Sequence, residues 1–102
     1  MSEKPLTALW LAHVTVTDAE AYGRYAALAT QAIAAHGGVF LARGGTSRQM
    51  EGTERQRNVV ARFPSLAAAE ACYASDLYQE ALGHARGAST RELVLVEELP
   101  QD

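Results

Sequence analysis

The chain has 102 residues, of which 48% are hydrophobic and 21% are charged, and its formal net charge is −3 at pH 7. These values predict one globular domain over residues 1–102, and the acidic balance argues against binding to nucleic acid or to an anionic membrane surface. No apolar run approaches the roughly 20 residues that a membrane-spanning helix needs, and residues 1–5 lack the basic and apolar pattern of a signal peptide. The single cysteine, Cys72, excludes an internal disulfide and fits a reducing compartment, so we expect a cytoplasmic protein.

The first half of the chain predicts a strand, a helix and a second strand. Residues 6–16 are apolar and rich in β-branched and aromatic side chains, which is typical of a strand. Thr17 and Glu20 have the spacing of a capping box at the start of a helix. One face of that helix repeats an apolar residue at every third or fourth position, at Tyr22, Ala26, Ala29 and Ile33. Gly37 is placed to end the helix, and residues 39–43 form the second predicted strand.

The second half repeats this arrangement. Residues 44–56 contain three glycines and many charges and predict a turn or loop, and residues 57–63 form a third strand. The helix that follows is interrupted at Ser75, which is a good N-cap for a second helical segment. Residues 92–99 form the last predicted strand. The order βαββαβ is typical of a ferredoxin-like α+β fold, in which a four-stranded antiparallel sheet has both helices on one face.

Both faces of the predicted sheet are apolar. In the first strand, Leu9 and Leu11 alternate with Trp10 and other apolar residues, and the other strands repeat this pattern. The helices can cover one face only, and soluble monomers rarely expose an apolar patch as large as the second face. We therefore predict a symmetric homodimer with the two sheets packed face to face. The residues expected to face the partner are Trp10, Phe40, Val60 and Val94, which we assign to the same face of the sheet. A slip of one residue in the strand pairing would exchange the two faces.

Short motifs are spread from about Leu9 to Val96. They are Asp18-x-x-x-Tyr22-x-x-Tyr25, His36-Gly37-Gly38, Arg43-Gly44-Gly45, Glu51-Gly52, Arg57, Phe63-Pro64-Ser65, Ser75-Asp76-x-Tyr78 and Arg86. In combination they resemble the DUF1330 family, a branch of the dimeric α+β barrel superfamily. The resemblance implies a ferredoxin-like protomer and a homodimer through the sheet faces, and it implies no established reaction. Relatives in the wider superfamily include cofactor-independent monooxygenases, haem-degrading enzymes, isomerases and dehalogenating lyases, several of which use a pocket between the sheet and the helices.

Two candidate catalytic residues lie at the ends of predicted strands. The planar guanidinium of Arg43 can hold a carboxylate or an enolate in two parallel hydrogen bonds. The alternative for Arg43 is a structural ion pair with Glu51 across the hairpin. His13 can act as a general base near neutral pH, and its alternative is a hydrogen-bonded residue at a strand end.

Four further residues are candidates for substrate binding. Arg57 has the same two interpretations as Arg43, and Arg86 lies near a helix C-terminus, where a cation is favoured without any ligand. Tyr25 and Tyr78 can line a pocket with their hydroxyl groups, although aromatic residues at helical spacing are more often part of a core.

We expect no metal and no bound cofactor. His36 fits a helix C-terminus, and His84 has no second ligand three or four residues away, so neither a zinc pair nor a haem ligand is indicated. Cys72 has no basic neighbour in the sequence and is interpreted as a buried, unreactive thiol.

Three functional classes are consistent with the predicted fold to different degrees. The first is an enzyme that transforms a small anionic or aromatic metabolite without a metal, and the second is a non-catalytic ligand-binding or structural dimer. The third, RNA binding on the sheet, is disfavoured because the chain is acidic and residues 57–63 lack the alternation of glycine and aromatic residues that stacks bases. A pocket whose wall holds Arg43 together with His13 or Arg57 would favour the first class over the second.

Overall fold

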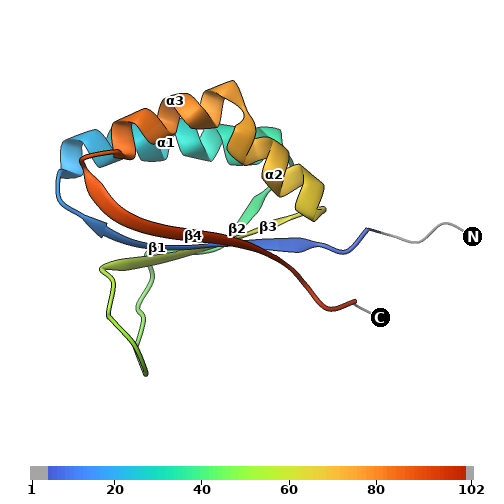
Figure 1. The fold of residues 1–102 in the computed structure, drawn as a ribbon, viewed down its shortest axis with the longest axis horizontal. Coiled ribbons are helices and arrows are strands. Elements are labelled where there is room, and N and C mark those ends of the chain that lie inside the picture. Colours follow the sequence, from blue (N-terminus) through green and yellow to red (C-terminus); the bar gives the residue numbers. More distant parts are fainter. Residues whose placement is uncertain (1–4, 101–102) are drawn as a thin grey trace, which may run out of the picture.

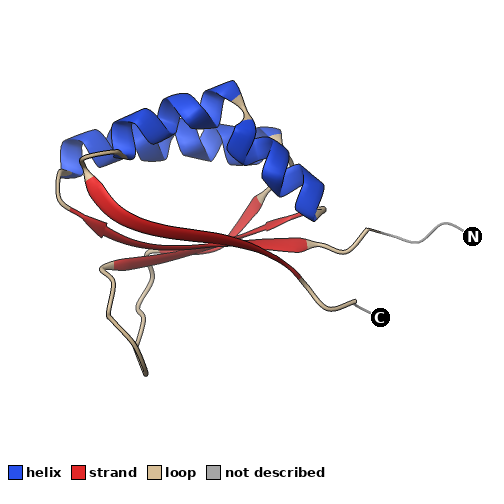
Figure 2. Cartoon of the chain, in the orientation of Figure 1, coloured by secondary structure: helices blue, strands red, loops and turns tan. Residues whose placement is uncertain are grey.

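A four-stranded sheet with helices on one face is the framework of the computed structural model, which describes residues 5–100. The elements are, in chain order, β1 (Ala8–Val16), α1 (Ala19–Ala35), β2 (Val39–Arg43), β3 (Arg57–Phe63), α2 (Leu66–Ala74), α3 (Asp76–Ala85) and β4 (Ser89–Glu97). The strand order is β2-β3-β1-β4 and every pairing is antiparallel. All three helices cover the same face (Figure 1, Figure 2). This confirms the predicted ferredoxin-like α+β fold.

Two strands differ in extent from their predictions. β1 begins at Ala8, two residues later than expected, and β4, from Ser89 to Glu97, begins three residues and ends two residues earlier than predicted. Residues 1–4, which entered the expectation about a signal peptide, lie outside the described residues. Within residues 5–100, no helix combines the length and the apolar character needed to cross a membrane.

The start of α1 corrects one prediction. Asp18, and not Thr17, is the N-cap, because its carboxylate accepts a hydrogen bond from the backbone N–H of Ala21 at 3.2 Å. The backbone N–H groups of Thr17 and Asp18 both donate to the carbonyl of Ala88, at 2.8 and 3.0 Å, just before β4. The capping box expected between Thr17 and Glu20 is therefore wrong.

Ser75 separates α2 from α3, as the sequence predicts. Its backbone N–H donates to the carbonyl of Cys72 at 3.1 Å, which ends α2. Its hydroxyl oxygen accepts from the backbone N–H of Tyr78 at 3.2 Å, which starts α3. One residue thus closes one helix and caps the next, so the chain changes direction without a longer loop.

The sheet register determines which residues face the helices. Trp10, Ala12 and Val14 are buried beneath the helices, and residues directly opposite them in β3 and β4 share that face. Leu9 and Leu11 lie on the other side of the sheet, which no element of the described chain covers and which we call the open face. Figure 1 shows loop 44–56 projecting on the same side as the open face, away from the helices.

The predicted partner-facing set is partly wrong. Trp10 is only 1% exposed and Phe40 packs against the same core, so both lie on the helix side. Val60 and Val94 are on the open face, because both pair with Leu11 across the sheet. Odd and even numbering does not carry over from one antiparallel strand to the next, since the turn lengths and the register decide which residues meet.

Aromatic side chains form the centre of the core. The indole of Trp10 lies 5.6 Å from the ring of Phe63 and meets the ring of Tyr78 edge-on, with centroids 5.1 Å apart. Tyr25 meets Tyr78 edge-on in turn, at 5.9 Å. These contacts join β1, β3, α1 and α3, and they place the tyrosine hydroxyl groups between the sheet and the helices.

Candidate functional site

A β-bulge in β2 directs Arg43 toward the helices. Phe40 pairs with Ala61, whereas Arg43, three residues later, pairs with Val59, only two residues away in β3. β2 therefore contains one extra residue. In a regular strand Arg43 would share the face of Val39, which is 61% exposed on the open face. The bulge places Arg43 on the helix side instead.

A cavity of about 40 Å³ lies between the sheet and α1, and we call it the inner cavity. Apolar and aromatic side chains form most of its wall, together with the three arginines Arg43, Arg57 and Arg91. No aspartate or glutamate is among the residues that line it. A single water molecule needs about 10–15 Å³ of such space, so the inner cavity has room for about three heavy atoms, the size of a carboxylate group.

The three guanidinium groups come from three different strands. Arg57 and Arg91 pair with the same residue, the buried Val14, from β3 and β4 on either side of β1. Nε of Arg57 and Nη1 of Arg91 are buried, and within residues 5–100 neither has a hydrogen-bond partner. Arg43 lies over the ring of Phe40 at 4.4 Å and donates to the hydroxyl of Thr30 at 3.3 Å. Buried donors without acceptors are unfavourable, and an anion in the cavity would satisfy them.

Two tyrosines and Arg91 form a hydrogen-bonded network beside the inner cavity. The hydroxyl groups of Tyr25 and Tyr78 are 2.8 Å apart, and Nη2 of Arg91 donates to the hydroxyl of Tyr78 at 3.2 Å. The guanidinium of Arg91 also lies over the ring of Tyr25, 4.4 Å from its centroid. Tyr25 lines the inner cavity, whereas Tyr78 is fully buried behind it.

Burial sets the charge states of this network. It raises the pKa of Tyr78 far above the ordinary value of 10, and it also raises the pKa of Tyr22, so both phenols are neutral at pH 7. Burial lowers the pKa of Arg91, but the oxygens of Tyr25 and Tyr78 outweigh this effect, so the net pKa is raised above the ordinary value of an arginine. Arg91 is therefore a permanent cation in a neutral, aromatic environment.

Gly44 gives Arg57 its position. Gly44 has a φ of +73° and its backbone N–H donates to the carbonyl of Asn58 at 3.0 Å. A Cβ atom at this residue would lie 3.2 Å from the guanidinium carbon of Arg57. Glycine is thus required both for the left-handed backbone and for the space that the arginine occupies.

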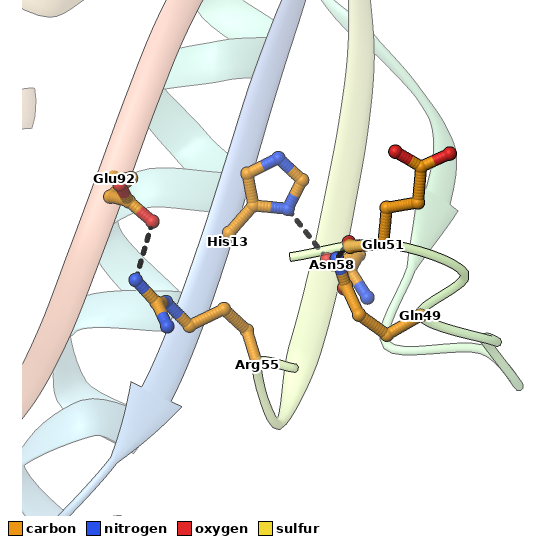
Figure 3. A network of polar contacts seen from close by, with 6 residues as sticks. All are labelled: His13, Gln49, Glu51, Arg55, Asn58 and Glu92. Atoms are coloured by element: carbon orange, nitrogen blue, oxygen red, sulfur yellow. Dashed lines mark hydrogen bonds and ion pairs between the residues drawn. The ribbon is translucent and has the colours of Figure 1, made fainter. Parts of the chain in front are cut away.

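His13 lies on the open face and does not reach the inner cavity. Its Nδ1 is 2.6 Å from Oδ1 of Asn58. Figure 3 shows the imidazole between Asn58 and the ion pair that Arg55 forms with Glu92 at 2.7 Å. The structure places the two candidate catalytic residues, His13 and Arg43, on opposite faces of the sheet. The wall of the inner cavity holds Arg43 together with Arg57, which is the second of the two combinations considered above.

The remaining predicted site residues do not all lie at the inner cavity. Tyr25 lines the cavity and Tyr78 contacts it through Tyr25, whereas Arg86 is the exposed C-cap of α3 and is not part of the wall. Within residues 5–100, Arg43 forms no ion pair with Glu51. The backbone carbonyl of Glu51 accepts a hydrogen bond from the side chain of Gln49 instead.

Arg91 is the functional candidate that the sequence analysis missed. The last strand was predicted to begin at residue 92, so Arg91 fell outside it. The available signal was alternation, because Arg91, Leu93 and Leu95 share one face of β4.

The chemistry of the described side chains disfavours two other kinds of site. Burial raises the pKa of the Cys72 thiol to about 11, so the cysteine is protonated and enclosed at pH 7. Residues 5–100 contain no group of three histidine, cysteine, aspartate or glutamate side chains that could hold a metal ion.

A wider hollow adjoins the inner cavity. This outer groove has a volume of about 490 Å³ and lies between the end of β1, the first turns of α1 and the start of β3. Both hollows are lined by Tyr22, Ala26 and Arg57.

Comparison with known proteins identifies relatives of the whole described fold. A model of the family described as "Domain of unknown function (DUF1330)" matches residues 7–99. RPA0582, a protein of unknown function from Rhodopseudomonas palustris, superposes with a TM-score of 0.75 at 22% identity, over 94% of this chain and 85% of that one. The methylated form of RPA0582 gives a TM-score of 0.76 at 21% identity, over 94% and 83% of the two chains. No curated protein matches the sequence.

A third similar structure has a described activity. SnoaB, a cofactor-independent oxygenase from Streptomyces nogalater, superposes with a TM-score of 0.64 at 15% identity, over 94% of this chain and 96% of its own. At this identity the likeness concerns the fold alone.

Proposed function

Because this chain belongs to the DUF1330 family, a domain of unknown function, we propose a function from its own side chains. The protein binds a small metabolite that carries a carboxylate or enolate together with an aromatic or other apolar part, and it transforms that metabolite without a metal. The acidic group of the ligand enters the inner cavity.

One observation carries this proposal: three guanidinium groups line a cavity whose wall contains no carboxylate. An arginine is always charged, and two of the three have buried nitrogen atoms without an acceptor in the described chain. A carboxylate or enolate would neutralise the site and accept these hydrogen bonds in the geometry that a guanidinium favours.

The same residues support a proton-transfer reaction. The arginines would stabilise negative charge that develops on the ligand oxygen. The hydroxyl of Tyr25 is the cavity's candidate for donating a proton to that oxygen, while water in the outer groove takes the proton that the neighbouring carbon loses and later returns a proton to Tyr25. Tyr78, held by Arg91, would keep Tyr25 in place. The wall of the inner cavity has no histidine, cysteine, aspartate or glutamate, so its donor set does not suit a metal ion. SnoaB, described as a cofactor-independent oxygenase, has a similar fold, which supports a reaction on a small molecule in this fold.

Benzoate and its neutral counterpart benzyl alcohol test the binding step in a thermal-shift measurement. A ligand at about 100 times its Kd adds about 2.7 kcal/mol of stability, which raises the melting temperature of a domain of this size by about 10 °C. We expect benzoate to give such a shift and benzyl alcohol to give little. Arg43→Lys keeps the charge but removes the planar fork, so it should reduce the benzoate shift while the fold persists.

Arg86→Lys is the matched control, because Arg86 is exposed at the end of α3 and does not line the cavity. An equal shift from benzoate and benzyl alcohol, or an Arg43→Lys variant that responds as the wild type does, would contradict the proposal.

A non-catalytic binding protein is the second candidate, and the small volume of the inner cavity favours it. Proton exchange separates the two. An enzyme of the proposed kind should accelerate exchange of the C–H protons of phenylpyruvate, an enolisable aromatic acid, with D₂O, as followed by NMR. Tyr25→Phe should abolish the acceleration while leaving benzoate binding intact. Exchange at the protein-free rate would leave binding as the function.

We also propose that the protein is a homodimer through its open faces. This face carries six partly or fully exposed aliphatic side chains on four strands: Leu9, Leu11, Val39, Val60, Val94 and Val96. An isologous contact between two copies would bury all of them at once, which is the arrangement that a twofold axis allows.

A further inference from the structure

We infer that the ligand has two parts: an acidic head in the inner cavity and a larger, mainly apolar body in the outer groove, with Tyr22 and Arg57 at the junction. This inference rests on the proposed function and specifies the class of ligand. The body is a ring system or short chain that carries an acceptor oxygen and no cationic group.

The two hollows are continuous in their walls. Tyr22, Ala26 and Arg57 line both, so these three residues mark the junction between the inner cavity and the outer groove. The guanidinium of Arg57 lies 5.8 Å from the ring centroid of Tyr22. A ligand whose carboxylate reaches the buried Nε of Arg57 therefore has its next atoms beside the Tyr22 ring.

The volumes determine how such a ligand is divided. The inner cavity holds about 40 Å³ and accepts only the head. The outer groove holds about 490 Å³, within the range of roughly 300–1,000 Å³ that is usual for small-molecule sites. A molecule larger than a carboxylate does not fit in the inner cavity, and the outer groove adjoins that cavity with space for the rest of the molecule.

The residues of the outer groove indicate the chemistry of the body. Val16, Ala19 and the ring of Tyr22 offer apolar contacts. Gln56 is fixed at its Oε1, which accepts from the backbone N–H of Val16 at 2.9 Å, so its amide nitrogen remains available as a donor. No acidic residue lines the groove, and Arg57 is part of its wall, so a cationic body would be disfavoured.

Gly23 keeps the outer groove open on the side of α1. It lines the groove from the interior of a helix, where glycine is unfavourable, and a Cβ atom there would have no other atom within 4 Å. A larger side chain at this position would project into the groove without disturbing the core. Gly83 in α3 is a matched control, because it is also an exposed helical glycine with nothing within 4 Å and it lines neither hollow.

Two carboxylates of different length test the inference by calorimetry. Acetate supplies the head alone, and biphenyl-4-carboxylate supplies a head with an apolar body. We expect Gly23→Leu to weaken binding of biphenyl-4-carboxylate by about tenfold or more and to leave acetate binding unchanged. Gly83→Leu should change neither. Ala19→Leu, one turn earlier on the same helix α1, should repeat the effect of Gly23→Leu, and circular dichroism shows that each variant is folded.

The outcomes distinguish this inference from the proposed function. If acetate binds in an Arg43-dependent way and Gly23→Leu and Ala19→Leu bind biphenyl-4-carboxylate as the wild type does, the two-part ligand is wrong and the anion site stands. If neither carboxylate binds to the wild type, both proposals fail.

Discussion

At the scale of single residues, the site depends on how a few charged side chains are oriented. Arg43 was recognisable from the sequence, because a lone arginine follows an apolar strand and precedes two glycines. Its separation from His13, on the opposite face of the sheet, was not recognisable, because a bulge that reverses the direction of one side chain leaves no mark on apolar alternation. Arg91 was missed for a simpler reason, an error of three residues in the start of β4.

Gly44→Ala tests the dependence of Arg57 on its neighbour. Alanine at a φ of +73° should lower the free energy of unfolding by about 1–2 kcal/mol, and its methyl group should displace the guanidinium of Arg57. We therefore expect lower stability in urea unfolding and weaker binding of benzoate. Gly52→Ala provides the comparison, since Gly52 has a φ of +84° but only the Gln49 side chain nearby. Equal loss of benzoate affinity in both variants would show that strain alone is responsible.

At the scale of elements, turn and cap residues carried most of the predictive information. Gly37 and Ser75 mark helix boundaries because their local chemistry requires little from the rest of the fold. The cap of α1 was assigned to Thr17 instead of Asp18, since both residues are good N-caps in isolation. The hydrogen bond that the Asp18 carboxylate accepts from the backbone N–H of Ala21 identifies Asp18 as the N-cap, and sequence spacing does not contain it.

Ser75→Ala tests the joint between α2 and α3. The hydroxyl accepts from the backbone N–H of Tyr78 and donates to the carbonyl of Cys72 at 2.7 Å. Its removal leaves the N–H of Tyr78 without this acceptor, whereas the carbonyl of Cys72 keeps the bond from the backbone N–H of Ser75. We expect a loss of about 1 kcal/mol in the free energy of unfolding, measured by urea denaturation. Ser47→Ala, in the exposed loop 44–56, should change stability by much less. A neutral Ser75→Ala variant would mean that water replaces the cap.

At the scale of the whole molecule, the composition of the strands indicated that both sheet faces are apolar, but not which residues lie on which face. The prediction of a homodimer does not depend on this assignment, because either face of the sheet would leave a large apolar surface exposed. The residues of each face can be assigned only when the register of the strands is known. The register depends on loop 44–56 and on the bulge in β2, and the apolar periodicity of the sequence reveals neither of them.

Val94→Asp tests the proposed homodimer. Val94 is 53% exposed in the single chain, so a carboxylate there should hardly affect the fold of a monomer. In a face-to-face dimer the same carboxylate would be buried without a partner, and we expect the dimer to dissociate in light scattering at micromolar concentration. Ala27→Asp, on an exposed position of α1, should leave the assembly unchanged. A wild-type monomer at the same concentration would contradict the homodimer.

The two borders of the sheet differ, and this difference bears on how the protein behaves when concentrated. β2 is short and bulged, which makes it a poor template for a further strand. β4 forms the other border over nine residues and pairs only with β1 within the described chain. Strand addition between molecules would thus start along β4, where the exposed Glu97 supplies a negative charge that repels the same residue of a second copy. Near the isoelectric point of about 5.5 the overall repulsion disappears, so fibrous aggregation should be fastest there and slower at neutral pH.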